Sequence, residues 1–199
     1  MTQSRAVTVA RLDGAGAARD EAAFRSVYAE VFAEPPYGET GDEVAAAFRR
    51  FRSQTRKPGF RAALARGPGD EPVGMAYGYP LAADTRWWEG MSEPVSDAMR
   101  HEDGRRTFGL MELAVRQRRR GQGVARRLHA ALLDGPGTER VLLNVRPDSA
   151  AAVAAYRSWG YRKVGSTRPW PGAVVHDVML LRLPGLPSSA GEGGARVVE

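Results

Sequence analysis

The sequence contains no cysteine, which excludes disulfide bonds, thiolate metal sites and a cysteine nucleophile. No apolar run approaches the ~18 residues that cross a membrane. Arg5, Arg11 and Asp13 interrupt the region where a secretory signal would carry its apolar core. We therefore expect a cytoplasmic protein. Histidine is also scarce: His129, in a helical pattern among arginines, is expected to face solvent, and no His, Asp and Glu spacing predicts a metal site.

Lysine is nearly absent, because Lys57 and Lys163 are the two lysines among 29 basic residues, and the formal net charge is +6. An arginine-rich surface suits phosphate groups, carried either by a nucleic acid or by an anionic cofactor. The remaining composition is that of an ordinary globular protein, with 199 residues, 43% hydrophobic and 26% charged. We expect one domain over residues 1–183 and a disordered tail over residues 184–199, which are small, polar and aperiodic.

Strand and helix patterns alternate along the chain. We expect strands at residues 6–12, 60–64, 73–79, 107–115, 140–145, 161–165 and 174–183, the second and third forming a hairpin. We expect helices from residue 20, from a capping box at Thr40 and Glu43, and over residues 123–133 and 149–159. Residues 82–106 show no period. They form either a lid or binding segment, or a surface excursion held by an apolar cluster. This order predicts a mixed α/β sheet with at least one parallel crossover.

The stretch from Leu113 to Ala125 is the most informative in the sequence. A strand ends near Val115, a basic turn follows, and a helix begins across Gly121 and Gly123. Backbone N–H groups at a helix N-terminus are unpaired and favour anions. Glycine lacks a Cβ atom, so an anion can approach the main chain closely. The pattern therefore predicts a cradle for a pyrophosphate group.

Other glycine motifs do not fit this turn. It lacks the lysine of a P-loop, Arg126 stands where a dinucleotide fingerprint has its third glycine, and Gly-x-Ser-x-Gly occurs nowhere in the chain. The pattern Arg-x-x-Gly-x-Ala at Arg120, Gly123 and Ala125 resembles the acyl-CoA pyrophosphate motif of the GNAT family of N-acetyltransferases. The resemblance continues downstream through Asn144-Val145-Arg146 and Tyr156-Arg157-Ser158-Trp159-Gly160-Tyr161, and covers residues 107–165.

This resemblance implies a single N-acetyltransferase domain with a mixed, mostly antiparallel sheet that is flanked by helices and splayed between its fourth and fifth strands. It implies acetyl-CoA as co-substrate, with no metal. Main-chain groups of the fourth strand would pair with the pantetheine arm, and those of the following turn would hold the pyrophosphate. The implied cofactor-binding residues are Leu113, Ala114, Val115, Arg120, Gly121, Gln122, Gly123, Val124, Ala125, Arg126, Asn144 and Ser149. Ser149 stands where the family often has an asparagine.

The resemblance also implies that Tyr156 is the general acid that protonates the departing sulfur. The alternative is a core tyrosine, because Tyr156 and Val153 lie on one helical stripe. General acid–base groups typically contribute ~10²–10⁴-fold to a rate.

Glu112 interrupts an otherwise apolar strand, and a period of two places it on one face with Leu110 and Ala114. Desolvation would raise its pKa towards that of a useful base. A structural salt bridge is the alternative. Some family members place a base on the fifth strand, where this chain has Asn144, which can orient water or substrate but cannot accept a proton.

We expect an acetyl-CoA-dependent N-acetyltransferase that transfers an acetyl group directly to a primary amine, on a small molecule or a peptide, in a ternary complex, because no cysteine can carry the acyl group. Two alternatives remain. One is a non-catalytic acyl-CoA-binding module of the same fold. The other is a basic nucleic-acid-binding protein that uses the arginines of residues 116–120, with Trp87, Trp88 or Trp170 as stacking platforms.

The acceptor is expected to enter near Tyr37, the Trp87 and Trp88 segment and the loop at Trp170. An aromatic wall would suit an amine with an apolar or planar body. The sequence leaves the oligomeric state open, a homodimer included.

Overall fold

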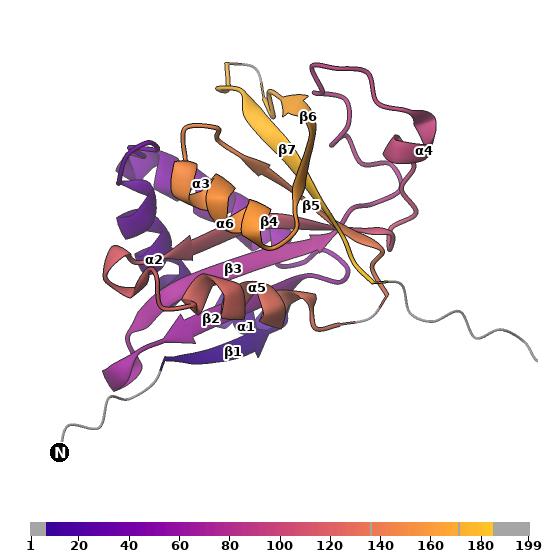
Figure 1. Ribbon diagram of the computed structural model, residues 1–199. Coiled ribbons are helices and arrows are strands. Elements are labelled where there is room, and N and C mark those ends of the chain that lie inside the picture. The colour runs from indigo at the N-terminus through magenta and orange to yellow at the C-terminus, as the bar shows by residue number, and fades with distance from the viewer. Residues whose placement is uncertain (1–6, 136, 171, 185–199) are drawn as a thin grey trace, which may run out of the picture.

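The computed structural model describes residues 7–135, 137–170 and 172–184 (Figure 1). The predicted tail from residue 185 onward and the first residue of the predicted opening strand lie outside these residues. The elements follow in the order β1 (Thr8–Leu12), α1 (Gly14–Arg19), α2 (Glu21–Phe32), α3 (Gly41–Gln54), β2 (Arg61–Arg66), β3 (Pro72–Pro80), α4 (Asp97–Arg100), β4 (Thr107–Val115), α5 (Val124–Leu133), β5 (Arg140–Val145), α6 (Ala150–Ser158), β6 (Arg162–Thr167) and β7 (His176–Arg182). The predicted strands and helices are all present, with shifts of a few residues at their ends.

The strands form one seven-stranded sheet in the order β1-β2-β3-β4-β5-β7-β6. Every neighbouring pair is antiparallel except β4 and β5, which are parallel and are joined through α5. Residues 107–109 of β4 pair with residues 140–142 of β5, and the described strands form no further ladder beyond Gly109. The predicted mixed sheet, mostly antiparallel and splayed between its fourth and fifth strands, is confirmed.

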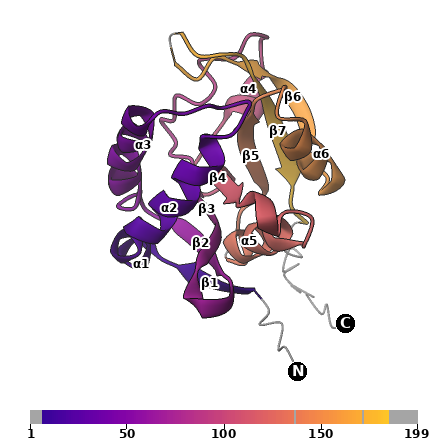
Figure 2. The same ribbon diagram turned by 90° about the vertical axis from the view of Figure 1, so that its left-hand side faces the viewer.

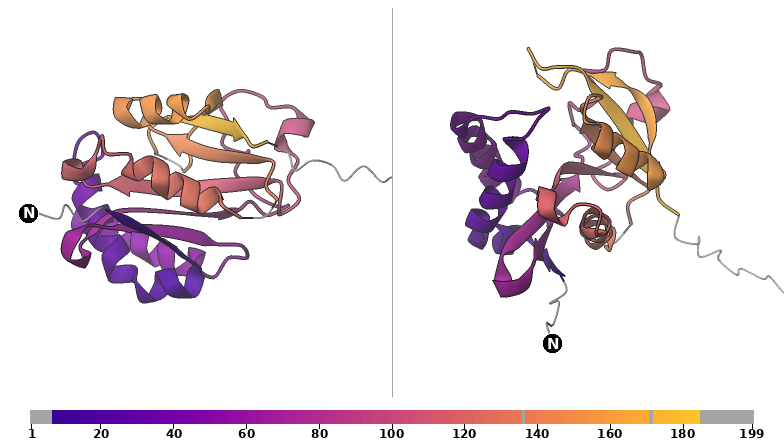
Figure 3. Two further views of the ribbon diagram at one scale, coloured as in Figure 1. Left: turned by 60° about the horizontal axis from the view of Figure 1, so that its bottom comes forward. Right: turned by 60° about the vertical axis from the view of Figure 1, so that its left-hand side comes forward.

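Helices cover both faces of the sheet (Figure 2). The helices α2 and α3 pack on one face, where Phe24, Val27 and Phe51 join an apolar cluster with Met75 and Tyr77 of β3. The helix α3 begins with the predicted capping box. The helices α5 and α6 cover the other face around a second cluster. Figure 3 shows α5 and α6 across the sheet from the N-terminal helices.

Two local features differ from expectation. The helix α1 was not predicted, because its sequence GAGAAR has no apolar period; the Asp13 side chain caps it by accepting a hydrogen bond from the Gly16 N–H. The prediction that His129 faces solvent is wrong. His129 is buried, its Nε2 lies 2.8 Å from the Tyr161 hydroxyl, and its ring packs against Trp159. Burial lowers the pKa of His129 to about 4, so its imidazole is neutral at physiological pH.

Residues 82–106 are anchored to the sheet by a third apolar cluster, in which Trp88 packs with residues of β5 and β7. The Trp88 Nε1 donates to Glu102 Oε1, and the same oxygen accepts from Arg140 Nη2 at 2.8 Å. Of the alternatives for residues 82–106, the structure therefore supports a surface excursion held by an apolar cluster. No helix in the described ranges is long and apolar enough to cross a membrane.

Candidate active site

The turn between β4 and α5 has the geometry of an anion cradle. Gly121 and Gly123 adopt φ angles of 71° and 74°, a region that side chains other than glycine rarely occupy. Gly123 is the N-cap of α5. A Cβ atom at either glycine would meet no other atom within 4 Å, so the main chain here borders open space. The amides at the start of α5 therefore face an accessible volume at the positive end of the helix dipole.

This cradle opens into a cavity of about 620 Å³ at the splay between β4 and β5. The size falls within the range of ~300–1,000 Å³ found for small-molecule sites. The predicted site residues that line the cavity are Leu113, Ala114, Val115, Arg120, Gly121, Gly123, Val124, Ala125, Arg126, Ser149 and Tyr156. The structure thus brings most of the predicted constellation together around one space.

Gln122, Asn144 and Glu112 are predicted site residues that do not line this cavity. The Gln122 side chain turns back and donates from Nε2 to the Arg118 carbonyl at 3.0 Å. The Asn144 Oδ1 is buried on β5 and accepts no hydrogen bond from the described part of the chain. Neither side chain has a contact here that assigns it to a cofactor.

The connection between α2 and α3 crosses the cavity from one arm of the splay to the other. On the β4 side, Glu34 pairs with Arg120 at 2.8 Å, and Arg120 Nε also donates to the Val115 carbonyl. On the β5 side, the Tyr37 hydroxyl lies 3.2 Å from Ser149 Oγ. In the sequence, Glu34 is recognisable only as part of the segment that ends a helix. No sequence pattern indicates that it pairs with Arg120, 86 residues later.

Tyr156 projects from α6 to the cavity wall. Only 8% of the residue is exposed, and its ring packs edge-on against Trp159 and Tyr161. Burial raises the pKa of Tyr156 above its ordinary value, so the hydroxyl keeps its proton at neutral pH. The two alternatives drawn from the sequence are combined here, because Tyr156 is a packed aromatic residue that also borders the cavity.

Glu112 lies on the α2 and α3 face of the sheet, and the prediction that it shares this face with Leu110 is wrong. The ladder between β3 and β4 pairs Tyr77 with Glu112 and Gly78 with Leu110, so Met111 is an extra residue in a β-bulge. Leu110 packs in the cluster beneath α5, whereas Ala114 packs in the cluster beneath α2 and α3. The bulge breaks the period of two on which the prediction rested.

The Glu112 carboxyl group makes no ion pair with any residue that the structure describes, so the salt-bridge alternative is not found. Desolvation and the nearby charge of Glu39 raise its pKa to about 8. Glu39 accepts a hydrogen bond from the Tyr28 hydroxyl at 3.0 Å, and its own pKa is also raised by burial. Glu39 was not identified from the sequence, because it stands in a turn whose path only the fold reveals.

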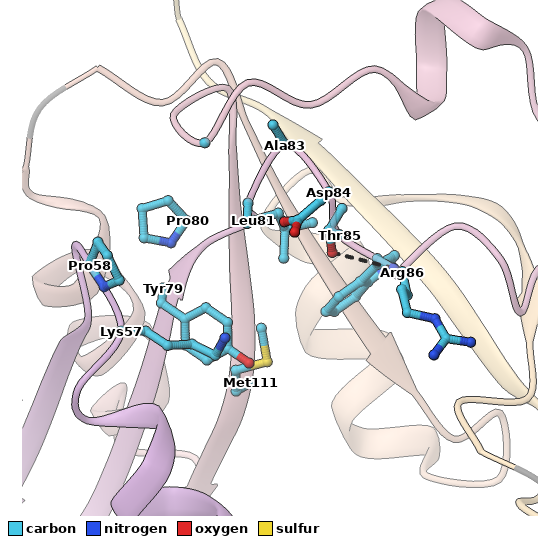
Figure 4. A pocket seen from close by; sticks show the side chains of 13 residues that line it. Lys57, Pro58, Tyr79, Pro80, Leu81, Ala83, Asp84, Thr85, Arg86 and Met111 are labelled. Carbon is cyan, nitrogen blue, oxygen red and sulfur yellow. Dashed lines mark hydrogen bonds between the residues drawn. The ribbon is translucent and has the colours of Figure 1, made fainter.

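A second cavity, of about 480 Å³, lies where β3 ends (Figure 4). Tyr79 and Met111 line it together with the chain from Pro80 to Trp87. Of the aromatic residues expected at an acceptor entrance, Trp87 lines this second cavity and Tyr37 lines the first. Trp170 is 59% exposed and lines neither.

The splayed mixed sheet and the amide cradle at its mouth define an α/β domain of the acetyltransferase class. The sequence profile of the acetyltransferase (GNAT) family matches residues 24–161. This chain belongs to that family, and the predicted membership is confirmed.

Solved structures share the fold at low sequence identity. A structure from Corynebacterium glutamicum described as "histone acetyltransferase HPA2 and related acetyltransferase" is 22% identical, with a TM-score of 0.60 over 92% of this chain and 98% of the other. The ribosomal-protein-S18-alanine N-acetyltransferase from Escherichia coli is 20% identical, with a TM-score of 0.58 over 94% and 98%. The PaiA N-acetyltransferase from Thermoplasma acidophilum, solved with coenzyme A, is 10% identical, with a TM-score of 0.60 over 89% and 99%.

One curated relative, an uncharacterized protein from Mycobacterium leprae, is 40% identical over 75 residues. The match covers 38% of this chain and 21% of the relative, so the chain spans about a fifth of that protein's length.

Proposed function

We propose that this protein is an acetyl-CoA-dependent N-acetyltransferase that transfers the acetyl group directly to a primary amine of a small molecule or peptide, within a single domain that ends near residue 183. Family membership supports acetyl transfer. The observation that carries the finer proposal is the single cavity that joins the amide cradle, the free edge of β4 and Tyr156.

The residues present fit an acyl-CoA. Main-chain groups of Leu113 to Val115 lie where β4 is no longer paired with β5. They can therefore pair with an extended pantetheine arm as they would with a neighbouring strand. The amides from Arg120 to Arg126 suit the pyrophosphate, with the dipole of α5 favouring its charge. When bound, the coenzyme supplies the activated thioester, and the protein supplies the orientation and the proton transfers.

Two side chains are suited to those proton transfers. Glu112 can accept the proton that the acceptor ammonium must lose before its nitrogen can attack, directly or through water, because its raised pKa is matched to that task. Tyr156 can donate a proton to the departing sulfur, because burial keeps its hydroxyl protonated. The absence of cysteine from the sequence favours direct transfer over a cysteine-linked acyl-enzyme.

The test is release of free thiol from acetyl-CoA across a library of primary amines, with acetylated amine detected by mass spectrometry. Amine-dependent release is the expected result. Tight acetyl-CoA binding without release on any amine would instead identify a non-catalytic acyl-CoA-binding module. Binding of RNA or DNA that weakens steeply with salt would favour the nucleic-acid alternative.

The pH dependence of turnover tests the role of Glu112. Because only the ionised carboxylate can accept a proton, kcat/KM should rise with pH and level off above about 8, the pKa of Glu112. Glu112→Gln should lower kcat/KM by roughly 10²-fold and remove the inflection near pH 8. An unchanged pH profile in Glu112→Gln would reject Glu112 as the base. A second, more slowly acetylated amine with a different pKa serves as the control. An inflection that shifts with the pKa of the amine reflects ionisation of the substrate rather than of Glu112.

Glu34 places a negative charge inside the cavity and occupies Arg120. Glu34→Gln should therefore tighten coenzyme A binding by roughly 3–10-fold at low salt, since the freed guanidinium can pair with phosphate. Glu30→Gln is the matched control: Glu30 lies one turn earlier on α2, pairs with Arg116 at 3.3 Å and does not line the cavity. Calorimetric titration with coenzyme A measures both variants, and weaker binding in Glu34→Gln would contradict the expectation.

A further inference from the structure

The second cavity has no part in the mechanism above, yet it lies beside the proposed reaction centre. It is lined by Tyr79 and Met111 of the sheet, by Lys57 and Pro58 of the α3–β2 connection and by residues 80–87 (Figure 4). The Lys57 Nζ lies 5.1 Å from the centre of the Tyr79 ring. The volume of the cavity, about 480 Å³, is that of a small-molecule site rather than of a packing defect.

The bulge in β4 relates this cavity to Glu112. As the extra residue of the bulge, Met111 packs against the cluster beneath α2 and α3, so it reaches the same face of the sheet as Glu112. Met111 lines the second cavity, and Leu113 to Val115 line the first. Along β4, Glu112 stands between Met111 and Leu113, and it lines neither cavity itself.

The lining of the second cavity is mostly apolar and aromatic, and its three charged residues, Lys57, Asp84 and Arg86, are exposed. The rings of Tyr79 and Trp87 and the Met111 thioether face it, together with proline and leucine side chains. Arg86 is mostly exposed and pairs with Glu89 at 2.7 Å. Such walls bind flat apolar groups well, because aromatic and thioether surfaces favour stacked and edge contacts.

We propose that this cavity binds the body of the acceptor, and that the acceptor is a small primary amine with a flat, aromatic body whose amino group reaches Glu112. This inference rests on the proposed function and narrows its substrate class. The thioester would approach from the first cavity and the amine from the second, and they would meet at Glu112. Glu112 takes the proton that the ammonium loses before attack. The C–N bond then forms and the thioester C–S bond breaks, with Tyr156 giving its proton to the departing sulfur. The second proton, which the nitrogen loses as the amide forms, returns to the Tyr156 oxygen.

Steady-state kinetics with tryptamine, phenethylamine, ethanolamine and spermidine test the proposal. We expect kcat/KM to favour the two aromatic amines. Trp87→Ala should raise KM for both aromatic amines by at least ~10-fold, because a buried ring contact is lost, and leave the affinity for coenzyme A within twofold. Ala83→Trp should have the same effect by filling the cavity from an exposed lining position, without removing any core contact. Trp170→Ala tests the alternative that the acceptor enters near Trp170.

Higher KM values in Trp87→Ala and Ala83→Trp, but not in Trp170→Ala, would support the assignment. Preference for spermidine or ethanolamine, or KM changes confined to Trp170→Ala, would overturn it. If the wild-type protein acetylates no amine, the proposed function fails separately, and calorimetric titration of tryptamine into the coenzyme A-loaded protein then decides. Binding that Trp87→Ala weakens supports the cavity, and absence of binding overturns it.

Discussion

Tyr156→Phe should lower kcat for acetyl transfer by ~10²–10⁴-fold while leaving the affinity for coenzyme A within twofold. The substitution removes only the hydroxyl group. The ring keeps its edge contacts with Trp159 and Tyr161, so the cavity wall and the fold are preserved. The loss arises because the departing sulfur would no longer receive a proton. Thiol release measures the rate, and calorimetric titration with coenzyme A measures binding.

Tyr161→Phe is the matched control for this experiment. It deletes a hydroxyl from the same aromatic cluster, but Tyr161 does not line the cavity and its hydroxyl contacts His129. This variant should lose some stability and keep its turnover. A second readout separates chemistry from structure: with p-nitrophenyl acetate as acyl donor, whose leaving group needs no proton, the defect of Tyr156→Phe should shrink. Equal defects with both donors would reject the role of Tyr156 as an acid.

The cradle was predictable from the sequence because its chemistry is local. Two glycines between a strand and a helix fix a main-chain geometry that needs no distant partner, and the structure gives Gly121 and Gly123 the positive φ angles this requires. The splay could be predicted only through the family resemblance. Strand periodicity alone does not state that β4 and β5 part after Gly109.

The parts of the site that were missed depend on contacts between distant segments. A bulge at Met111 reverses the face of Leu110, and nothing in an apolar run marks which residue will be the extra one. Glu34 and Glu39 lie in the connection after α2. Glu34 pairs with Arg120 in the turn before α5, and Glu39 accepts from Tyr28 on α2. His129 was misplaced because the α6–β6 turn, which covers it, contributes Trp159 and Tyr161.

Glu102→Leu should lower the free energy of unfolding by roughly 3–5 kcal/mol, because it leaves the Arg140 guanidinium buried without a counter-charge. The two side chains are 0% and 2% exposed and lie 2.8 Å apart. Glu102 also accepts from Trp88 Nε1, so its loss should loosen residues 82–106, which form a wall of the second cavity. Urea denaturation measures the stability, and KM for aromatic amines should rise in parallel.

Two further variants, Glu139→Leu and the double variant Glu102→Leu/Arg140→Met, test whether the loss of stability is specific to the buried ion pair. Glu139 pairs with Arg106 at 3.1 Å in a solvent-exposed position, so its removal should cost at most about 1 kcal/mol. Combining Glu102→Leu with Arg140→Met should recover part of the loss, since the unpaired buried charge is then gone. A Glu102→Leu protein as stable as Glu139→Leu would show that the buried pair does not anchor residues 82–106. If Glu102→Leu is destabilised but its KM for aromatic amines is unchanged, the buried pair anchors residues 82–106 without determining the shape of the second cavity.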